Sequence, residues 1–184
     1  SSLPTDERNL VVKAAIGFFD RADVGRGVRI HLEKRLPHQA GLGGGSANAA
    51  VTLSALNELF GEPLQVTDLH EIAAGLGSDV PFFLSDEPAL ATGRGEKIER
   101  LGEFRVLHGT SMTIVHPGFG VPTGWAYAQL AKHADLIAGE SGRASRLADA
   151  FQAGDEAGWG MLFNAFERPV FDKYPLLGLL TEQF

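Results

Sequence analysis

Cysteine is absent from this 184-residue chain, which excludes disulfides, thiolate metal sites and a cysteine nucleophile. No apolar run approaches the roughly 20 residues that a membrane-spanning helix needs. An excess of positive charge is also lacking: 16 Lys and Arg against 23 Asp and Glu give a formal charge of −7, which argues against a nucleic-acid-binding face. The composition fits a reducing compartment and predicts a cytoplasmic protein that binds neither nucleic acid nor membrane.

Several catalytic signatures are missing as well. No Gly-x-Ser-x-Gly nucleophile elbow is present, which argues against a serine hydrolase. The histidines show neither an i,i+4 pair nor metal-ligand spacing, so polar strand faces or the surface are the expected place for His31, His38, His70, His108, His116 and His133.

The most informative segment is a glycine cluster between an alternating segment and an alanine-rich one. Four of the five residues from Gly41 to Gly45 are glycine, and they follow Lys34, Arg35 and Pro37. Glycine permits a close approach of the backbone to a ligand, and the helix that follows offers free N–H groups and the positive end of its dipole. The pattern predicts a phosphate-binding loop, although an isolated glycine cluster is also compatible with a simple turn.

This loop belongs to neither of two common nucleotide-binding types. It lacks the Gly-Lys-Ser/Thr triplet of the P-loop, and no acidic residue ends a second strand about 20 residues later, as in dinucleotide-binding folds. Ser46 falls in the first turn of the expected helix, where its hydroxyl can reach a phosphate or the Mg²⁺ bound to it.

The periodicity of apolar residues predicts both helices and strands. Helices are expected over 6–19, 46–60, 125–137 and 147–152, with a capping-box start at Asp68 and Glu71 for a short helix ending near Gly75. Residues 28–33 and 112–115 are expected as strands, 90–98 as a hairpin, and 80–84 as a strand or buried loop. A helix around 164–167 is expected to break at Pro169. The apolar pattern and the composition loosen near 102–109, which predicts a weak domain boundary there.

A single carboxylate stands out in Gly75-Leu-Gly-Ser-Asp-Val-Pro-Phe-Phe-Leu84. Asp79 lies between a glycine-containing turn and an apolar segment. One interpretation is a cap or turn residue. The other is a carboxylate at the edge of a desolvated pocket, which orients and deprotonates a substrate hydroxyl, as phosphoryl transfer requires.

The segment His116-Pro-Gly-Phe-Gly-Val-Pro-Thr123 is rich in turn-forming residues and predicts a stiff loop. It is either a plain connector or a wall of the acceptor pocket. In the second case Thr123 and Tyr127 would supply polar and stacking contacts.

Taken together, these motifs resemble the GHMP kinase superfamily. The resemblance rests on blocks that occur in the order expected for the superfamily. They are 9–15, 36–50, Leu56-Asn57, 76–83, 92–96 and 116–123. Within the superfamily, the Leu-Gly-Ser-Asp-Val-Pro and His-Pro-Gly blocks are most similar to the kinases of the non-mevalonate isoprenoid pathway. Residues 134–160 match weakly.

The resemblance implies an α+β fold in two parts. The first, over 1–106, would be an ATP-binding mixed-sheet domain like that of a ribosomal protein. The second, over 107–184, would be the start of an α/β-plait domain.

The resemblance also implies a reaction and its residues. ATP would donate its γ-phosphate to the 2-hydroxyl of 4-diphosphocytidyl-2-C-methyl-D-erythritol, with Asp79 as the catalytic base and Mg²⁺ bridging the phosphates. Asn9 and Lys34 would lie near the nucleotide. The ATP phosphates would be wrapped by Pro37, His38, Gln39, Ala40, Gly41, Leu42, Gly43, Gly44, Gly45, Ser46, Ala47 and Asn48.

Two parts of the superfamily pattern have no counterpart here: a lysine-bearing first strand and a glycine-rich loop near the C-terminus. Without that lysine, Asp79 loses a cation that would lower its pKa and balance charge at the reacting oxygen. The chain alone is therefore expected to be a weak or inactive kinase. Two alternatives stay open: a GHMP kinase acting on another alcohol, and a catalytically silent nucleotide-binding protein.

Overall fold

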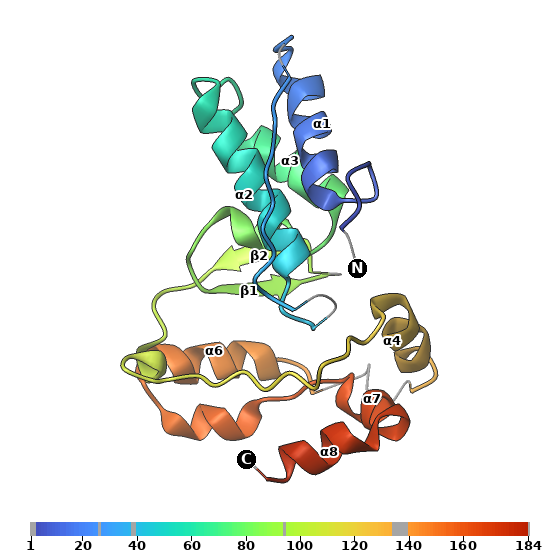
Figure 1. The fold of residues 1–184 in the computed structure, drawn as a ribbon. Coiled ribbons are helices and arrows are strands. Elements are labelled where there is room, and N and C mark those ends of the chain that lie inside the picture. Colours follow the sequence, from blue (N-terminus) through green and yellow to red (C-terminus); the bar gives the residue numbers. More distant parts are fainter. Residues whose placement is uncertain (1–2, 26, 38–39, 94, 134–139, 184) are drawn as a thin grey trace. The chain divides into compact units, whose positions relative to one another are not determined.

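In the computed structural model, residues 3–25, 27–37, 40–93, 95–133 and 140–183 are described (Figure 1). They form two compact units: Ser1–Leu36 with Gly43–Leu101, and Pro37–Leu42 with Gly102–Phe184, called here the first and the second unit. None of the helices in these ranges combines the length and apolar character needed to cross a bilayer.

The first unit is built from three helices and a hairpin. The helices are α1 (Leu10–Ala22), α2 (Gly44–Leu59) and α3 (Val66–Leu76), followed by the 3₁₀ turn η1 (Pro81–Leu84). Strands β1 (Ala89–Thr92) and β2 (Lys97–Arg100) pair antiparallel, with Ala89 opposite Arg100 and Thr92 opposite Lys97. The predicted α+β class and hairpin are confirmed.

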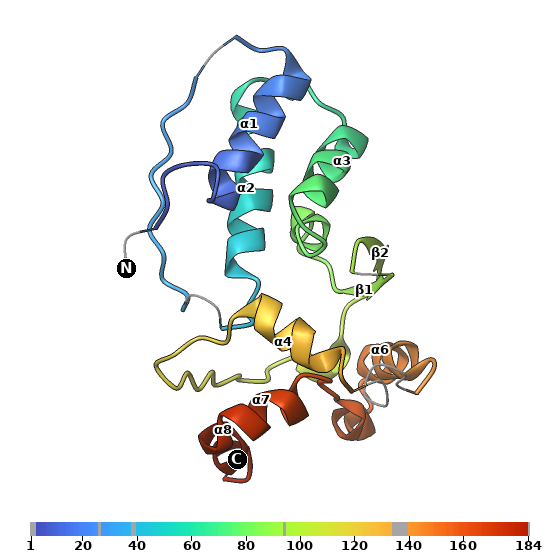
Figure 2. The same ribbon diagram turned by 90° about the vertical axis from the view of Figure 1, so that its right-hand side faces the viewer.

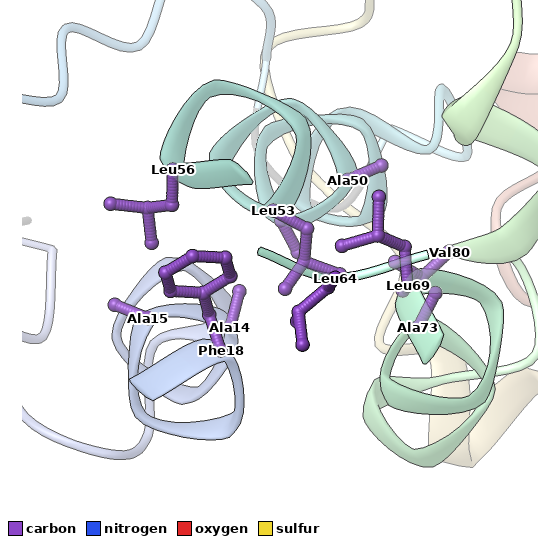
Figure 3. Packing of buried hydrophobic residues seen from close by; sticks show 11 residues of the cluster. Ala14, Ala15, Phe18, Ala50, Leu53, Leu56, Leu64, Leu69, Ala73 and Val80 are labelled. Atoms are coloured by element: carbon purple, nitrogen blue, oxygen red, sulfur yellow. The ribbon is translucent and has the colours of Figure 1, made fainter. Parts of the chain in front are cut away.

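The three helices pack around a core of small and branched side chains. Ala14 and Phe18 of α1, Leu53 of α2 and Ala73 of α3 are fully buried and point toward one another (Figure 3). The contact between α1 and α3 is close, because a Cβ at Gly17 would lie only 3.0 Å from Cγ2 of Ile72. The small residues thus let the helices approach, and the aromatic and branched ones fill the space between them.

One polar side chain lies inside this core. Asn57 of α2 is 8% exposed, and it donates from Nδ2 to the carbonyl oxygen of Leu64 at 3.1 Å and accepts from the Leu64 amide at 3.0 Å. Both polar groups of a buried residue in the α2–α3 connection are therefore satisfied by one side chain.

Two predicted strands are wrong in this structure. Residues 28–33 and 112–115 are not assigned to a strand, and Figure 2 shows 27–36 as a separate extended trace. An alternating sequence makes a strand only when a neighbour completes the hydrogen-bond ladder. Within the described ranges only β1 and β2 form such a hydrogen-bond ladder. Val28 and Ile30 are left 37% and 40% exposed.

Other corrections concern the ends of helices. The capping box of α3 is made by Gln65 and Asp68, so Asp68 lies one turn inside the helix and Glu71 is not part of the box. Residues 80–84 contain a 3₁₀ turn rather than a strand.

The second unit contains short helices. They are η2 (Arg105–Leu107), α4 (Thr123–Leu130), α6 (Arg143–Ala153), η3 (Glu156–Met161), α7 (Glu167–Lys173) and α8 (Pro175–Thr181). Pro169 does not break a helix as predicted: it lies in the first turn of α7, where a missing N–H costs nothing. The helix predicted over 125–137 corresponds to α4, which ends earlier, at Leu130; residues 131–133 are not helical, and residues 134–137 lie outside the described residues.

The core polar contact predicts a stability change. Asn57→Ala is expected to lower the free energy of unfolding by about 2–4 kcal/mol, because both polar groups of Leu64 would be left unpaired. Urea denaturation followed by far-ultraviolet circular dichroism measures this. Glu58→Ala is the control, since Glu58 is the exposed neighbour; a loss for Asn57→Ala no larger than that of the control would contradict the role of the contact.

A second prediction concerns pH. Hydrogen bonds from Arg21, and then from the Gln65 amide, hold the pKa of Asp68 below its ordinary value. A carboxyl whose pKa is lower in the folded state stabilises the protein above its unfolded pKa of about 3.9, and this stabilisation is lost as the pH falls through the folded value. The urea midpoint of the wild type should therefore fall more steeply from about pH 5 to pH 2 than that of Asp68→Asn. Parallel curves would show that the Arg21–Asp68 pair contributes nothing.

Candidate functional site: a glycine loop and an acidic turn in the first unit

The end of the glycine loop forms the N-terminus of α2. Gly43 is the N-cap residue with φ +63°, a left-handed conformation that favours glycine, and no side chain caps the helix. The carbonyl of Gly43 accepts from the Ala47 amide at 2.9 Å. Among the described residues no group accepts a hydrogen bond from the amides of Gly44, Gly45 or Ser46. These amides are therefore available to an anion at the positive end of the helix dipole.

A cation lies beside this helix end. A Cβ at Gly44 would lie 3.3 Å from Nζ of Lys34 and 3.6 Å from Cδ1 of Leu36, so glycine is what lets the lysine approach. Lys34 is half-buried, and no carboxylate in the described ranges forms an ion pair with it. A lysine next to the positive end of a dipole is favourable only when an anion joins them. The electrostatics of this corner therefore suit a phosphate.

Asp79 lies in the turn that leads from α3 into η1. The turn is closed by a hydrogen bond from the Val80 amide to the Gly77 carbonyl at 3.1 Å. The N-cap position of η1 belongs to Val80 rather than Asp79, and it has no side-chain cap. The Asp79 side chain is exposed and accepts no hydrogen bond from another described residue. Asp79 is thus a turn residue rather than a helix cap, and its carboxylate has no hydrogen-bond partner among the described residues.

Phe83 connects the acidic turn to the glycine loop. A Cβ at Gly43 would lie 2.6 Å from Cζ and 2.9 Å from Cε2 of Phe83, so only glycine leaves room for the ring. The ring also packs on the hydrophobic core, next to the fully buried Val80 and Pro81. The backbone that follows Asp79 is therefore pressed against the start of α2.

A pocket of about 310 Å³ lies along α2. It lies between the extended residues 28–32 and α2, and it is mostly apolar, with His31, Asn48 and Thr52 as polar members. The alternation of Val28 and Ile30 was the only sequence signal for it. Neither Phe83 nor this cavity was expected as part of the site, because each depends on segments distant in sequence.

The other predicted site residues are placed as follows. Asn9 is the N-cap of α1: it accepts from the Val11 amide at 3.0 Å and donates to the Pro4 carbonyl at 2.9 Å. A nucleotide contact would have to use its second amide hydrogen or a remaining lone pair. Ala47 and Asn48 continue the first turns of α2.

Several predicted residues belong to the second unit. Pro37, Ala40, Gly41 and Leu42 are grouped with it, and Gly41 has φ +73°. His38 and Gln39 lie outside the described residues.

The predicted acceptor residues also lie in the second unit. Thr123 begins α4 and is exposed. Tyr127, one turn later, is 58% exposed and packs edge-on against Phe166, with 4.9 Å between ring centroids.

The residues present suit a metal ion only if bound phosphates supply part of its ligands. In the described ranges no cluster of three His, Asp or Glu side chains is arranged to hold a cation. Mg²⁺ commonly keeps waters and substrate phosphates as ligands and takes few from protein. Ser46, on the first turn of α2, is the hydroxyl that such an ion would use.

Comparisons with known proteins agree with these features. The family described as GHMP kinases N terminal domain matches residues 9–87, which include the glycine loop and Asp79. The 4-diphosphocytidyl-2-C-methyl-D-erythritol kinase of Chloroherpeton thalassium is 38% identical over 184 residues, covering 100% of this chain and 63% of its own length. That of Chlorobium phaeobacteroides is 40% identical over 182 residues, covering 98% of this chain and 62% of its own length.

A solved structure agrees as well. A crystal structure of 4-(cytidine 5'-diphospho)-2C-methyl-D-erythritol kinase superposes with a TM-score of 0.69 at 31% identity, covering 97% of this chain and 62% of that one. The chain thus spans about three fifths of the length of these relatives (63% and 62%). With its glycine loop, its acidic turn and its likeness to these kinases along the whole chain, the protein resembles the GHMP kinases, whose N-terminal domain model matches residues 9–87.

Proposed function

We propose that the protein of which this chain is part transfers the γ-phosphate of ATP to the 2-hydroxyl of 4-diphosphocytidyl-2-C-methyl-D-erythritol. The observation that carries the proposal is that one unit holds the first amides of α2, Lys34 and the Asp79 carboxylate, none of which has a hydrogen-bond or ion-pair partner among the described residues. The substrate is taken from the names of the relatives, which are kinases of this compound.

The phosphate half of the reaction is assigned to the glycine loop and Lys34. The amides of Gly44, Gly45 and Ser46 donate to oxygens of the triphosphate. Lys34 adds one positive charge where the transition state carries its negative charge. The apolar cavity beside α2 is large enough to hold a flat purine ring, and Asn48 on its wall offers a hydrogen-bonding amide.

Asp79 is assigned the proton transfer. Its carboxylate accepts the proton of the 2-hydroxyl as that oxygen forms a bond to the γ-phosphorus. The bond between the γ-phosphorus and the β–γ bridging oxygen breaks, and ADP leaves with the electron pair. An exposed carboxylate that accepts no hydrogen bond from another described residue is suited to this role, because its lone pairs can accept from the substrate.

Mg²⁺ bound to the phosphates would neutralise charge on the triphosphate, with the Ser46 hydroxyl as the protein ligand. Thr123 and Tyr127 are assigned to the acceptor, with the half-exposed ring of Tyr127 as a stacking surface for the cytosine.

The assigned role of Asp79 as the base can be tested in the protein encoded by the complete reading frame. Asp79→Asn should lower kcat by about 10²–10⁴-fold, because the amide cannot take the proton, with the dissociation constant of ATP changed less than about threefold. Steady-state kinetics with the methylerythritol substrate and calorimetric ATP titration give the two values. Asp86→Asn, an exposed carboxylate in the same region, is the matched control and should retain wild-type kcat.

The substrate class has its own test. Cytidine diphosphate should compete with the acceptor, because it carries the nucleotide half of that substrate. Turnover of another alcohol without inhibition by cytidine diphosphate would favour a different GHMP kinase. ATP binding without turnover of any alcohol would favour a silent nucleotide-binding protein.

A further prediction tests the role of Lys34. Lys34→Gln should raise the dissociation constant of ATP about tenfold and weaken its dependence on salt, since one charge contact to phosphate is lost. Lys13→Gln removes an exposed lysine of α1 and should leave both unchanged. Equal effects of the two substitutions would mean that net charge, not the position of Lys34, matters.

A further inference from the structure

The acidic turn is held from its C-terminal side by one arginine. Arg100, the last residue of β2, donates from Nη2 to the carbonyl oxygen of Pro81 at 3.2 Å and from Nη1 to that of Phe82 at 3.0 Å. Nη1 also lies 3.4 Å from the Glu87 carbonyl oxygen. The guanidinium therefore binds two consecutive peptide carbonyls, which begin two residues after Asp79.

The aromatic side chain of the same segment adds a second contact. The guanidinium carbon of Arg100 lies 5.9 Å from the centroid of the Phe82 ring, within the range of a cation–π contact. In the part of the chain that the structure describes, Arg100 forms no ion pair with a carboxylate. Its charge is thus directed at the backbone of η1.

The other end of the hairpin meets the acidic turn itself. A Cβ at Gly95 would lie 3.6 Å from Oδ1 of Asp79 and 3.6 Å from Cβ of Ser78. The hairpin therefore contacts the segment 78–82 at both of its ends, near Asp79 through Gly95 and beyond it through Arg100.

A lysine could not replace this arginine. The planar guanidinium presents several N–H groups in a fixed fork that binds neighbouring acceptors at once, whereas an ammonium is a point charge on a flexible stem. Because Phe83 packs against Gly43, fixing Pro81 and Phe82 also fixes where the Asp79 turn stands relative to the N-terminus of α2.

We propose that Arg100 is a positioning residue for phosphoryl transfer: by binding the carbonyls of Pro81 and Phe82, it holds the Asp79 turn in register with the glycine loop. This inference rests on the proposed kinase function, because it assigns Arg100 to the placement of the base in that reaction.

The test compares Arg100→Gln and Arg100→Lys with wild type in the protein encoded by the complete reading frame. Arg100→Gln should lower kcat about 10–100-fold, the size expected when a catalytic group shifts by about 1 Å, with the KM for ATP within about threefold. In the same variant, hydrogen exchange by mass spectrometry should speed up about tenfold in peptide 77–84, where the Phe83 amide bonds the Val80 carbonyl at 3.1 Å. Arg100→Lys should fall between the two in both measurements.

Lys97→Gln is the matched control, because it removes one positive charge from the same strand at an exposed position. It should retain wild-type kcat and exchange. If Arg100→Gln does not fold, Arg100→Lys carries the test. The proposal is overturned if Arg100→Gln, or Arg100→Lys where Arg100→Gln does not fold, keeps a kcat within twofold of wild type or shows unchanged hydrogen exchange in 77–84.

The outcomes separate this inference from the proposed function. Should the wild type show no kinase activity, the proposed function fails, and exchange in 77–84 alone decides whether Arg100 holds the turn. If the wild type is active and the Arg100 variants behave like Lys97→Gln, the proposed function stands and only the role of Arg100 is refuted.

Discussion

The contact between Gly43 and the ring of Phe83 is the constraint on which the first unit's site depends. Gly43 has a left-handed backbone and no room for a side chain, while Phe83 is wedged between this backbone and the core. An aromatic ring is a rigid spacer with only two side-chain torsions. The start of α2 and the segment that carries Asp79 are therefore kept in contact by packing.

The polar side chains of the first unit fall into two groups. Asn57, Arg21 and Arg100 have their hydrogen-bonding capacity directed at backbone or carboxylate groups, where they fix one part of the fold against another. Lys34 and Asp79 have no such partners among the described residues, and neither have the first amides of α2. Such groups can bind a ligand without first breaking a contact within the protein.

The sequence was sufficient for what is local. Helix periodicity located α1, α2 and α6 to within a few residues, and the Thr92-Gly-Arg-Gly95 turn located the hairpin. Glycine spacing indicated the loop because the backbone requirement is carried by the residues themselves. The motifs also indicated a resemblance to the GHMP kinases, which the comparisons confirm.

What could not be predicted depends on partners distant in the chain. The alternation at 28–33 is a correct sign of extended backbone, yet pairing requires a neighbouring strand that the described residues do not provide. Neither Phe83 nor Arg100 stands out in the sequence. The role of Phe83 comes from its packing against Gly43, and that of Arg100 from its hydrogen bonds to the carbonyls of Pro81 and Phe82. No local sequence pattern predicts these contacts.

The division into two units has a consequence for spectroscopy. The chain has 2 Trp and 2 Tyr, and all of them, Trp125, Trp159, Tyr127 and Tyr174, lie in the second unit, whereas the first unit has only phenylalanine as an aromatic. Intrinsic ultraviolet fluorescence therefore follows the second unit alone. A fluorescent reporter for the half that holds the glycine loop and Asp79 has to be introduced there, and the absence of cysteine makes a single engineered thiol a unique point of attachment.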